Sequence, residues 1–290
     1  MASAAPSLCC RQIEESDIET VASLLAQGFR TRDLQFWLEA FAQLRRHATP
    51  PGLPKYGYLL ESDGRTVGTV LLICSLARVG ENDAPRCNLS SWYVDPAFRA
   101  YAPMLVSQAL RHKDVTYVNV SPARHTWPII EAQGFSRYCD GLFIAVPMVS
   151  GFFGGPKVKV FDATRKPSVS FDPRDQDMLL QHAAHGCVSL WCATAERAYP
   201  FVFRRRFVRG IVPYAQLIYC TDVADFVRFA GPLGRSLARR GLPLAMIDAN
   251  APIPGLVGRY CGGNIPKYFK GPQRPRLGDL AYSENAVIGV

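Results

Sequence analysis

The order of apolar patterns along the chain constrains its fold most. Two segments with helical spacing, 17–28 and 33–47, precede a hairpin that turns at Asp63-Gly64. Strands and helices then alternate over 88–94, 99–112, 115–120, 126–133 and 141–149. This alternation predicts an α/β fold, with a mixed sheet covered by helices.

A similar order begins again after the glycine-rich stretch 151–156. We expect helices at 175–185 and 224–240, strands at 187–193, 201–207, 213–220 and 243–247, and closing strands at 268–269 and 280–288. The two halves share no convincing residue identity. The repeated order nevertheless predicts two tandem domains, 1–155 and 156–290, and 290 residues suit two domains of roughly 100–200 residues each.

Composition excludes several classes of protein. Hydrophobic residues make up 48% and charged residues 20%, which excludes a disordered or fibrous chain. The longest nearly apolar stretch, 142–155, is too short to span a bilayer. The first six residues lack the pattern of an export signal, so we expect a frayed tail on a cytoplasmic protein. The nine irregularly spaced cysteines predict reduced, mostly buried thiols and no metal site.

Charge is divided unevenly between the halves. Residues 1–150 carry 14 basic and 14 acidic side chains, whereas 151–290 carry 19 and 10 and so hold the whole net charge of +9. This basic surface either keeps the protein soluble or meets an anionic ligand or an acidic partner protein. Nucleic acid is the weakest hypothesis, because no helix-turn-helix, RNP-type or zinc motif is present.

Four segments of the first half carry a family resemblance. In order they are Arg11–Ile18, Asp63–Gly68, Trp92–Arg99 and Ile129–Phe135. They resemble the opening strand and helix, the hairpin, the fourth strand with its V-x-P-x-x-R exit, and the helix before Gly-Phe of the GNAT superfamily of acyl-CoA-dependent N-acyltransferases. The resemblance covers about residues 10–140 and implies the acyl-CoA N-acyltransferase fold, with the second domain as a degenerate copy.

The resemblance implies a donor site for acetyl-CoA or a longer acyl-CoA. In the family, backbone N–H groups at the start of the helix after strand four take the CoA pyrophosphate. The residues expected to bind CoA are Tyr93, Val94, Arg99, Ala100, Tyr101, Ala102, Met104 and Asn119. Ala102 and Met104 stand where the family has glycines, and Pro103 lacks an N–H, so a fold that has lost its cofactor is the alternative.

The resemblance also implies splayed strands four and five, with a backbone N–H near Trp92 polarising the acyl carbonyl. Ile130 replaces the family's tyrosine acid, and strand four has no acidic base. The replacement candidates are His125, as a base acting through water, and Tyr138, as a donor to the leaving sulfur. The alternatives are a capping or solvent-facing histidine and a tyrosine of the core.

The second half has different features. Asp222 and Asp225 stand where a phosphate loop would lie, and their charges would repel a pyrophosphate. In the basic cluster Arg204–Arg206 with Arg209, strand alternation sends Arg204 and Arg206 to one face and Arg205 to the other. The cluster either protects an edge strand or docks an acidic carrier protein or the CoA 3′-phosphate. The loop 266–276 is expected to border the acceptor site.

Two hypotheses follow. In the first, the protein is an N-acyltransferase that moves an acyl group from acyl-CoA, or from an acyl carrier protein, to a small primary amine by direct attack. In the second, it is a non-catalytic protein that binds acyl-CoA or a partner on a degenerate acyltransferase fold.

Overall fold

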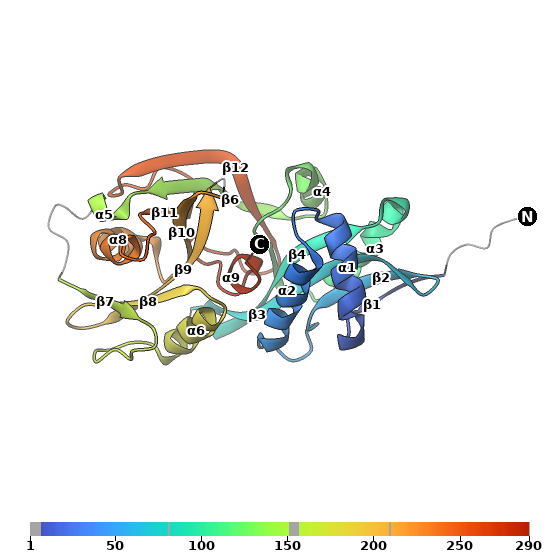
Figure 1. Ribbon diagram of the computed structural model, residues 1–290, viewed down its shortest axis with the longest axis horizontal. Helices are drawn as coiled ribbons and strands as arrows, with labels where there is room; N and C mark the ends of the chain where they lie inside the picture. Colours follow the sequence, from blue (N-terminus) through green and yellow to red (C-terminus); the bar gives the residue numbers. More distant parts are fainter. Residues whose placement is uncertain (1–6, 81, 151–156, 209, 290) are drawn as a thin grey trace, which may run out of the picture.

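A single twelve-stranded sheet runs through the described part of the chain (Figure 1). The computed structural model describes residues 7–80, 82–150, 157–208 and 210–289. The strand order is β1-β2-β3-β4-β5-β12-β6-β11-β10-β9-β8-β7. Because β4–β5 and β10–β11 are parallel and the other pairs antiparallel, the predicted mixed α/β class is confirmed. The predicted domain boundary at 155/156, the tail before residue 7 and Arg209 lie outside the described residues.

The first half follows the predicted element order. Its strands are β1 (Leu8–Gln12), β2 (Gly57–Ser62), β3 (Arg65–Val79), β4 (Asn82–Val94), β5 (Thr116–Asn119) and β6 (Ser136–Ala145). Its helices are α1 (Ile18–Gly28), α2 (Leu34–Arg46), α3 (Ala102–Ala109), α4 (Trp127–Ala132) and α5 (Pro147–Ser150), with 3-10 turns η1 (Glu15–Asp17), η2 (Pro96–Tyr101) and η3 (Arg124–Thr126). Asp33 caps α2 by accepting a hydrogen bond from the Phe36 N–H at 2.8 Å.

Strand alternation gives this half two cores. Leu59 and Leu71 point to the face that α1 and α2 cover, whereas Leu60 and Leu72 point to the face that α3 covers. Figure 1 shows α1 and α2 lying together over the first half of the sheet.

The second half also has helices on both faces of the sheet. Its strands are β7 (Lys159–Asp162), β8 (Val188–Ala193), β9 (Ala198–Val208), β10 (Val212–Cys220), β11 (Leu244–Ala249) and β12 (Gly258–Lys270). Its helices are α6 (Pro173–Ala184), α7 (Val223–Arg228), α8 (Ala230–Ala238) and α9 (Glu284–Val287). Met178 and Leu179 of α6 pack on one face, and Phe226 and Leu233 of α7 and α8 on the other.

The predicted closing strand 280–288 is wrong. Residues 284–287 form the short helix α9, and Ala286 and Val287 donate backbone hydrogen bonds to the Ser283 carbonyl. Val287 and Ile288 complete the core under α1 and α2. A short buried apolar run does not distinguish strand from helix by its pattern, and here the tertiary contacts decide.

The last strands of the two halves are exchanged. β12, from the second half, lies between β5 and β6, and β6, from the first half, lies between β12 and β11. The strand order therefore reads the same outward from the β12–β6 pair in both directions, with β5, β4, β3 and β2 matched by β11, β10, β9 and β8. As a result, each half completes the sheet of the other.

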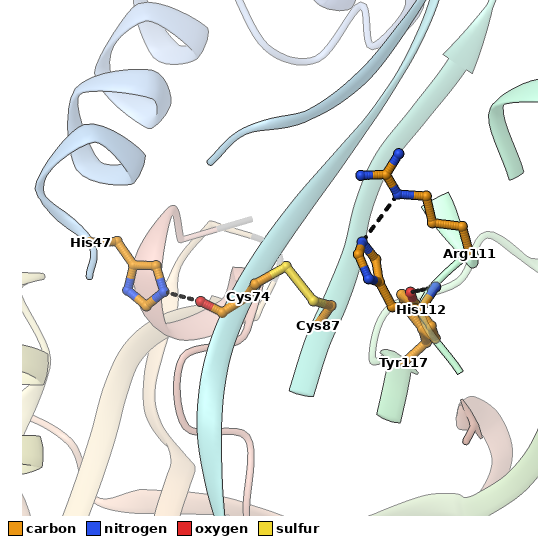
Figure 2. Close-up of a disulfide and its surroundings, with 6 residues drawn as sticks. All are labelled: His47, Cys74, Cys87, Arg111, His112 and Tyr117. Atoms are coloured by element: carbon orange, nitrogen blue, oxygen red, sulfur yellow. Dashed lines mark hydrogen bonds between the residues drawn. A yellow bond between two sulfur atoms is a disulfide. The ribbon is translucent and has the colours of Figure 1, made fainter. Parts of the chain in front are cut away.

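Cysteine usage differs from the prediction at one pair. The register of β3 and β4 places Cys74 opposite Cys87, with their Cα atoms 4.0 Å apart, and the two form a disulfide (Figure 2). The expectation of reduced thiols throughout is wrong for this pair. Nε2 of His47 lies 2.8 Å from the Cys74 carbonyl oxygen. The free cysteines of the described residues are mostly buried, as predicted.

None of the helices in the described ranges has both the length and the apolar character needed to cross a membrane.

Candidate functional site between the fourth and fifth strands

Strands β4 and β5 pair briefly and then part. Their parallel register runs from Arg86 opposite Thr116 to Asn88 opposite Val118, while β4 continues to Val94. Pairing ends just where the resemblance implies a splay. The backbone of β4 beyond Asn88 therefore has no β5 partner.

A β-bulge on β4 lies in the parted region. Tyr93 pairs with Thr69 and Ser90 with Leu71, so two residues of β4, Ser91 and Trp92, stand opposite a single residue of β3. Ser91 has a φ of +52°, which is uncommon for a residue other than glycine. Because a bulge bends its strand and increases the local twist, this one helps turn β4 away from β5.

The gap between the strands holds a cleft of about 220 Å³. Its lining comes from β4, from the end of β5 and the chain that follows it into α4, from the segment between α1 and α2 with the first turn of α2, and from α9. The lining residues are Phe29, Thr31, Arg32, Trp37, Leu89, Ser90, Ser91, Trp92, Asn119, Ser121, Pro122, Ala123, Thr126, Ile130 and Glu284.

Glu284 inserts a carboxylate between the parted strands. Ser90, on β4, donates a hydrogen bond from its hydroxyl to Oε2, and Ser121, just after β5, donates one to Oε1. Among the described lining residues Glu284 is the only acid, and Glu284 is 3% exposed. Its carboxylate therefore joins the two strands at the point where their backbones separate.

Opposing influences act on the pKa of Glu284. Burial raises the pKa above the ordinary value of 4.5, while the hydrogen bonds from Ser121 and Ser90 and the charges of Arg206 and Lys267 oppose that rise. The net direction is upward, so this carboxyl holds a proton more readily than a solvated glutamate does.

The sequence matches no protein-family model and no curated protein, but comparison with solved structures is informative. The chain is similar to a GCN5-related N-acetyltransferase from Anabaena variabilis, with a TM-score of 0.57 and 11% identity over 91% of this chain and 72% of that one. A GCN5-related N-acetyltransferase from Kribbella flavida is similar with a TM-score of 0.56 and 12% identity, over 91% of this chain and 71% of that one. The glucosamine N-acetyltransferase region of a fungal multi-domain β-N-acetylglucosaminidase is similar with a TM-score of 0.60 and 11% identity, over 92% of this chain and 38% of that one.

The chain has the GCN5-related N-acetyltransferase fold. The resemblance seen over residues 10–140 is thus confirmed as a likeness of fold, and the likeness extends over more than nine tenths of the chain.

Within this GCN5-related fold, two of the predicted residues reach the cleft. Trp92 and Asn119 line it from β4 and β5, together with Ile130. The indole N–H of Trp92 is buried and has no hydrogen-bond partner. The other two β4 candidates face the cores instead: Val94 packs beneath α3, and the ring of Tyr93 lies against Phe29.

The predicted pyrophosphate residues form a helical turn directly after β4. Arg99, Ala100 and Tyr101 belong to η2, and Ala102 and Met104 to the first turn of α3. Met104 is 38% exposed and so does not fill a cavity. The N–H of Ala102 donates to the Arg99 carbonyl, and Asp95 caps the start of η2 by accepting from the Ala97 N–H at 3.1 Å. CoA binding by these residues stays a prediction.

The two predicted proton-transfer residues do not line the cleft. His125 is exposed in η3 and lies outside the lining, although Thr126 beside it belongs to it. Tyr138 is 3% exposed on β6 and packs edge-on against Phe269, and burial raises its pKa well above 10.

The basic cluster on β9 has a structural role. Arg204 and Arg206 bond the segment around α9, whereas Arg205 on the other face bonds the Arg240 carbonyl, so the predicted alternation is confirmed. The edge-strand interpretation is wrong, because β9 lies between β10 and β8. In the second half, the Asp222 carboxylate occupies the helix start as expected and caps α7 by accepting from the Ala224 N–H at 2.9 Å.

The loop expected at 266–276 begins later, after Lys270, and the predicted strand at 268–269 is confirmed as part of β12. Residues up to Lys270 form the end of β12, and Lys267 and Tyr268 are fully buried. Residues 273–276 line another pocket with Arg78 and Arg86, away from the cleft. The sequence pattern indicates this strand only at 268–269, because glycines and a proline interrupt the rest of 258–270.

Sequence reasoning missed Glu284 and its two serine donors. The sequence does carry one signal, the polar triplet Ser283-Glu284-Asn285 inside an otherwise apolar run. All three residues are buried, and buried polar side chains need partners, which for Glu284 and Asn285 lie far away in the sequence.

Proposed function

We propose that this protein is an N-acyltransferase that moves an acyl group from acyl-CoA, or from an acyl carrier protein, to a small primary amine. The observation that carries the proposal is the parting of β4 and β5 into a lined cleft just before a helical turn. An extended thioester arm can take the place that a strand would otherwise fill.

The residues present fit such a donor. The pantetheine arm of CoA carries amide groups, and the β4 backbone beyond Asn88 lacks β5 partners with which those amides would compete. The indole N–H of Trp92 supplies a further donor without a partner. A buried polar group without a partner costs free energy, which a bound ligand can recover.

Direct attack by the amine is the chemistry this lining supports. The described lining residues include neither a cysteine nor a histidine beside a serine, so no activated side-chain nucleophile is in place for an acyl-enzyme. Two reactants held in line in a small cleft gain rate from proximity and orientation alone.

The test combines binding with turnover. Isothermal titration with acetyl-CoA and with longer acyl-CoAs should show saturable binding, and thiol release should then depend on added primary amine. Binding without turnover would instead support the non-catalytic alternative. If neither acyl-CoA nor an acylated carrier protein binds, both hypotheses are wrong.

A matched pair of variants links the binding to the cleft. Trp92→Phe removes the indole N–H that faces no partner, and it should weaken acyl-CoA binding about 5- to 10-fold, the worth of one hydrogen bond. Trp191→Phe removes an indole N–H that donates to Gln176 Oε1 at 3.2 Å in the second half, where neither residue belongs to the lining, and it should leave the affinity unchanged.

A further inference from the structure

The segment that carries Glu284 is anchored from several sides. Arg204 donates from Nη1 to the Ala286 carbonyl at 3.3 Å. Arg206 donates to Asn285 Oδ1 and to the Gly289 carbonyl, each at 2.8 Å. These two arginines project from β9 of the second half, and Figure 1 shows α9 between the two halves of the sheet. The helix is only four residues long, so these contacts rather than its own hydrogen bonds fix its place.

The chain entering α9 is held as firmly. The guanidinium of Arg86, on β4, makes two hydrogen bonds to the Asp279 carboxylate at 3.0 and 3.2 Å, and a third to the Ala281 carbonyl at 2.8 Å. Arg86 and Asp279 are both buried. Glu284 is thus fixed relative to β4 through a buried ion pair on one side and relative to β9 on the other.

We propose that Glu284 is the general base of the acyl transfer, supplied to the first half's cleft by the second half. The inference rests on the proposed function. The amine nitrogen attacks the thioester carbonyl carbon and forms the C–N bond, and its proton passes to a Glu284 oxygen. The C–S bond then breaks, the thiolate takes a proton from water, and Glu284 returns its proton to solvent.

The surroundings of Glu284 suit this role. It is the only acid among the described lining residues, and each of its oxygens accepts one serine hydroxyl while retaining a lone pair for a proton. The charged groups that act on it are Arg206 from β9 and Lys267 from β12, and Arg32 lines the same cleft. A carboxylate with a pKa raised toward the working pH is a better proton acceptor than an exposed one.

The same contacts would also suit a Glu284 that only holds β4 and the chain after β5 in place. The pH dependence of the rate distinguishes this structural role from the role of a general base. Glu284→Gln keeps the shape of the side chain but cannot take the proton. We expect kcat/KM to fall about 10²- to 10⁴-fold, and we expect the fall of kcat/KM at acidic pH to disappear from the pH profile. The affinity for acetyl-CoA should stay within about twofold of that of the unaltered protein. Glu19→Gln, at an exposed position of α1, is the control and should change neither.

Ser121→Ala provides an independent readout. The Ser121 hydroxyl holds the pKa of Glu284 down, so its removal should move the acidic limb of the pH–rate profile to higher pH. Arg206→Lys keeps the positive charge, but a lysine cannot donate to both Asn285 Oδ1 and the Gly289 carbonyl as the guanidinium does. Because these bonds position α9 and its Glu284, the variant should lower kcat more than it raises KM.

The possible failures can be told apart. If Glu284→Gln retains the rate and the acidic limb, the base assignment is wrong and the acyltransferase function stands. An Arg206→Lys or Ser121→Ala variant with an unchanged profile would count against the assignment in the same way. If the unaltered protein releases no thiol with acetyl-CoA and any primary amine, the proposed function fails, and this inference fails with it.

Discussion

His182 and His185 are buried where α6 meets α2 and the C-terminal segment. Nδ1 of His182 lies 2.8 Å from the Met178 carbonyl, and Nε2 accepts from the Tyr282 N–H at 3.1 Å, so the ring is neutral. Nδ1 of His185 lies 2.9 Å from Gln43 Oε1. Burial lowers the pKa of each ring to about 4. Both rings are therefore held in the neutral form at pH values where a solvated histidine is protonated.

We expect these rings to make stability fall in mild acid. In the unfolded chain they take protons near pH 6.5, and in the folded chain only near pH 4. Their contribution to the free energy of unfolding is therefore complete above pH 6.5, and it is lost as the pH falls toward 4. Between pH 7.5 and 5.0, the unfolding free energy of the unaltered protein should drop about 2 kcal/mol more than that of His182→Gln. Urea unfolding at both pH values measures this, and parallel losses would contradict it.

Single residues were predictable only where the family pattern marks them. Trp92 and Asn119 reach the cleft because strand order carries them there, whereas His125 and Tyr138 were chosen by chemistry and lie elsewhere. Glu284 could not be found in this way, since 163 residues separate it from Ser121. No local pattern reports a contact over that distance.

At the scale of elements, α8 and α5 approach closely at one glycine. A Cβ on Gly234 would lie 2.2 Å from the Met148 backbone nitrogen and 2.6 Å from the Pro147 carbonyl carbon. Both opposing atoms belong to the backbone, so neither can rotate away. The close packing of α5 against α8 thus depends on the absence of a side chain at Gly234.

Gly234→Ala should destabilise the protein although alanine is the better helix former. Propensity alone would add about 1 kcal/mol of stability. Separation of the two helices costs more, because overpacking is typically worth about 1–3 kcal/mol and the contact here is with rigid backbone. We expect a net loss of about 1–2 kcal/mol in chemical denaturation. Ser107→Ala, exposed on α3, is the control and should be neutral or slightly stabilising; a gain at Gly234 would contradict the argument.

Elements with a long pattern or a defined cap were predicted well. The helices after Asp17 and Asp33 and the hairpin at Asp63-Gly64 are where periodicity and turn chemistry place them. The errors at 266–267 and 280–288 fall in short buried segments. There the partners across the sheet, rather than the local pattern, decide the conformation.

At the scale of the whole molecule, the exchange of β6 and β12 joins the halves. β5 pairs with β12 from Tyr117 to Asn119, and β6 pairs with β11 along Gly141 to Ala145. Sequence order alone predicts that each half closes its own sheet, because neighbouring strands in the chain are usually neighbours in space. The exchange is set by long-range pairing that element order does not encode.

A fragment of residues 1–150 should not fold on its own. Without the second half, β5 and β6 lose the partners that β12 and β11 provide, and unpaired strand edges promote aggregation. Circular dichroism melting and gel filtration should show no cooperative transition and a tendency to associate. Co-production with residues 157–290 should restore a soluble complex. A monomeric fragment with a cooperative melt would contradict this prediction.

The strand exchange also sets an order of events during synthesis. The ribosome makes β4 and β5 before residue 120, but it adds β12 only at residues 258–270 and α9 only at 284–287. The growing polypeptide therefore holds an incomplete cleft throughout most of translation. Any polypeptide that stops before residue 258 would lack both β12, which lies between β5 and β6, and the Glu284 carboxylate between the parted strands.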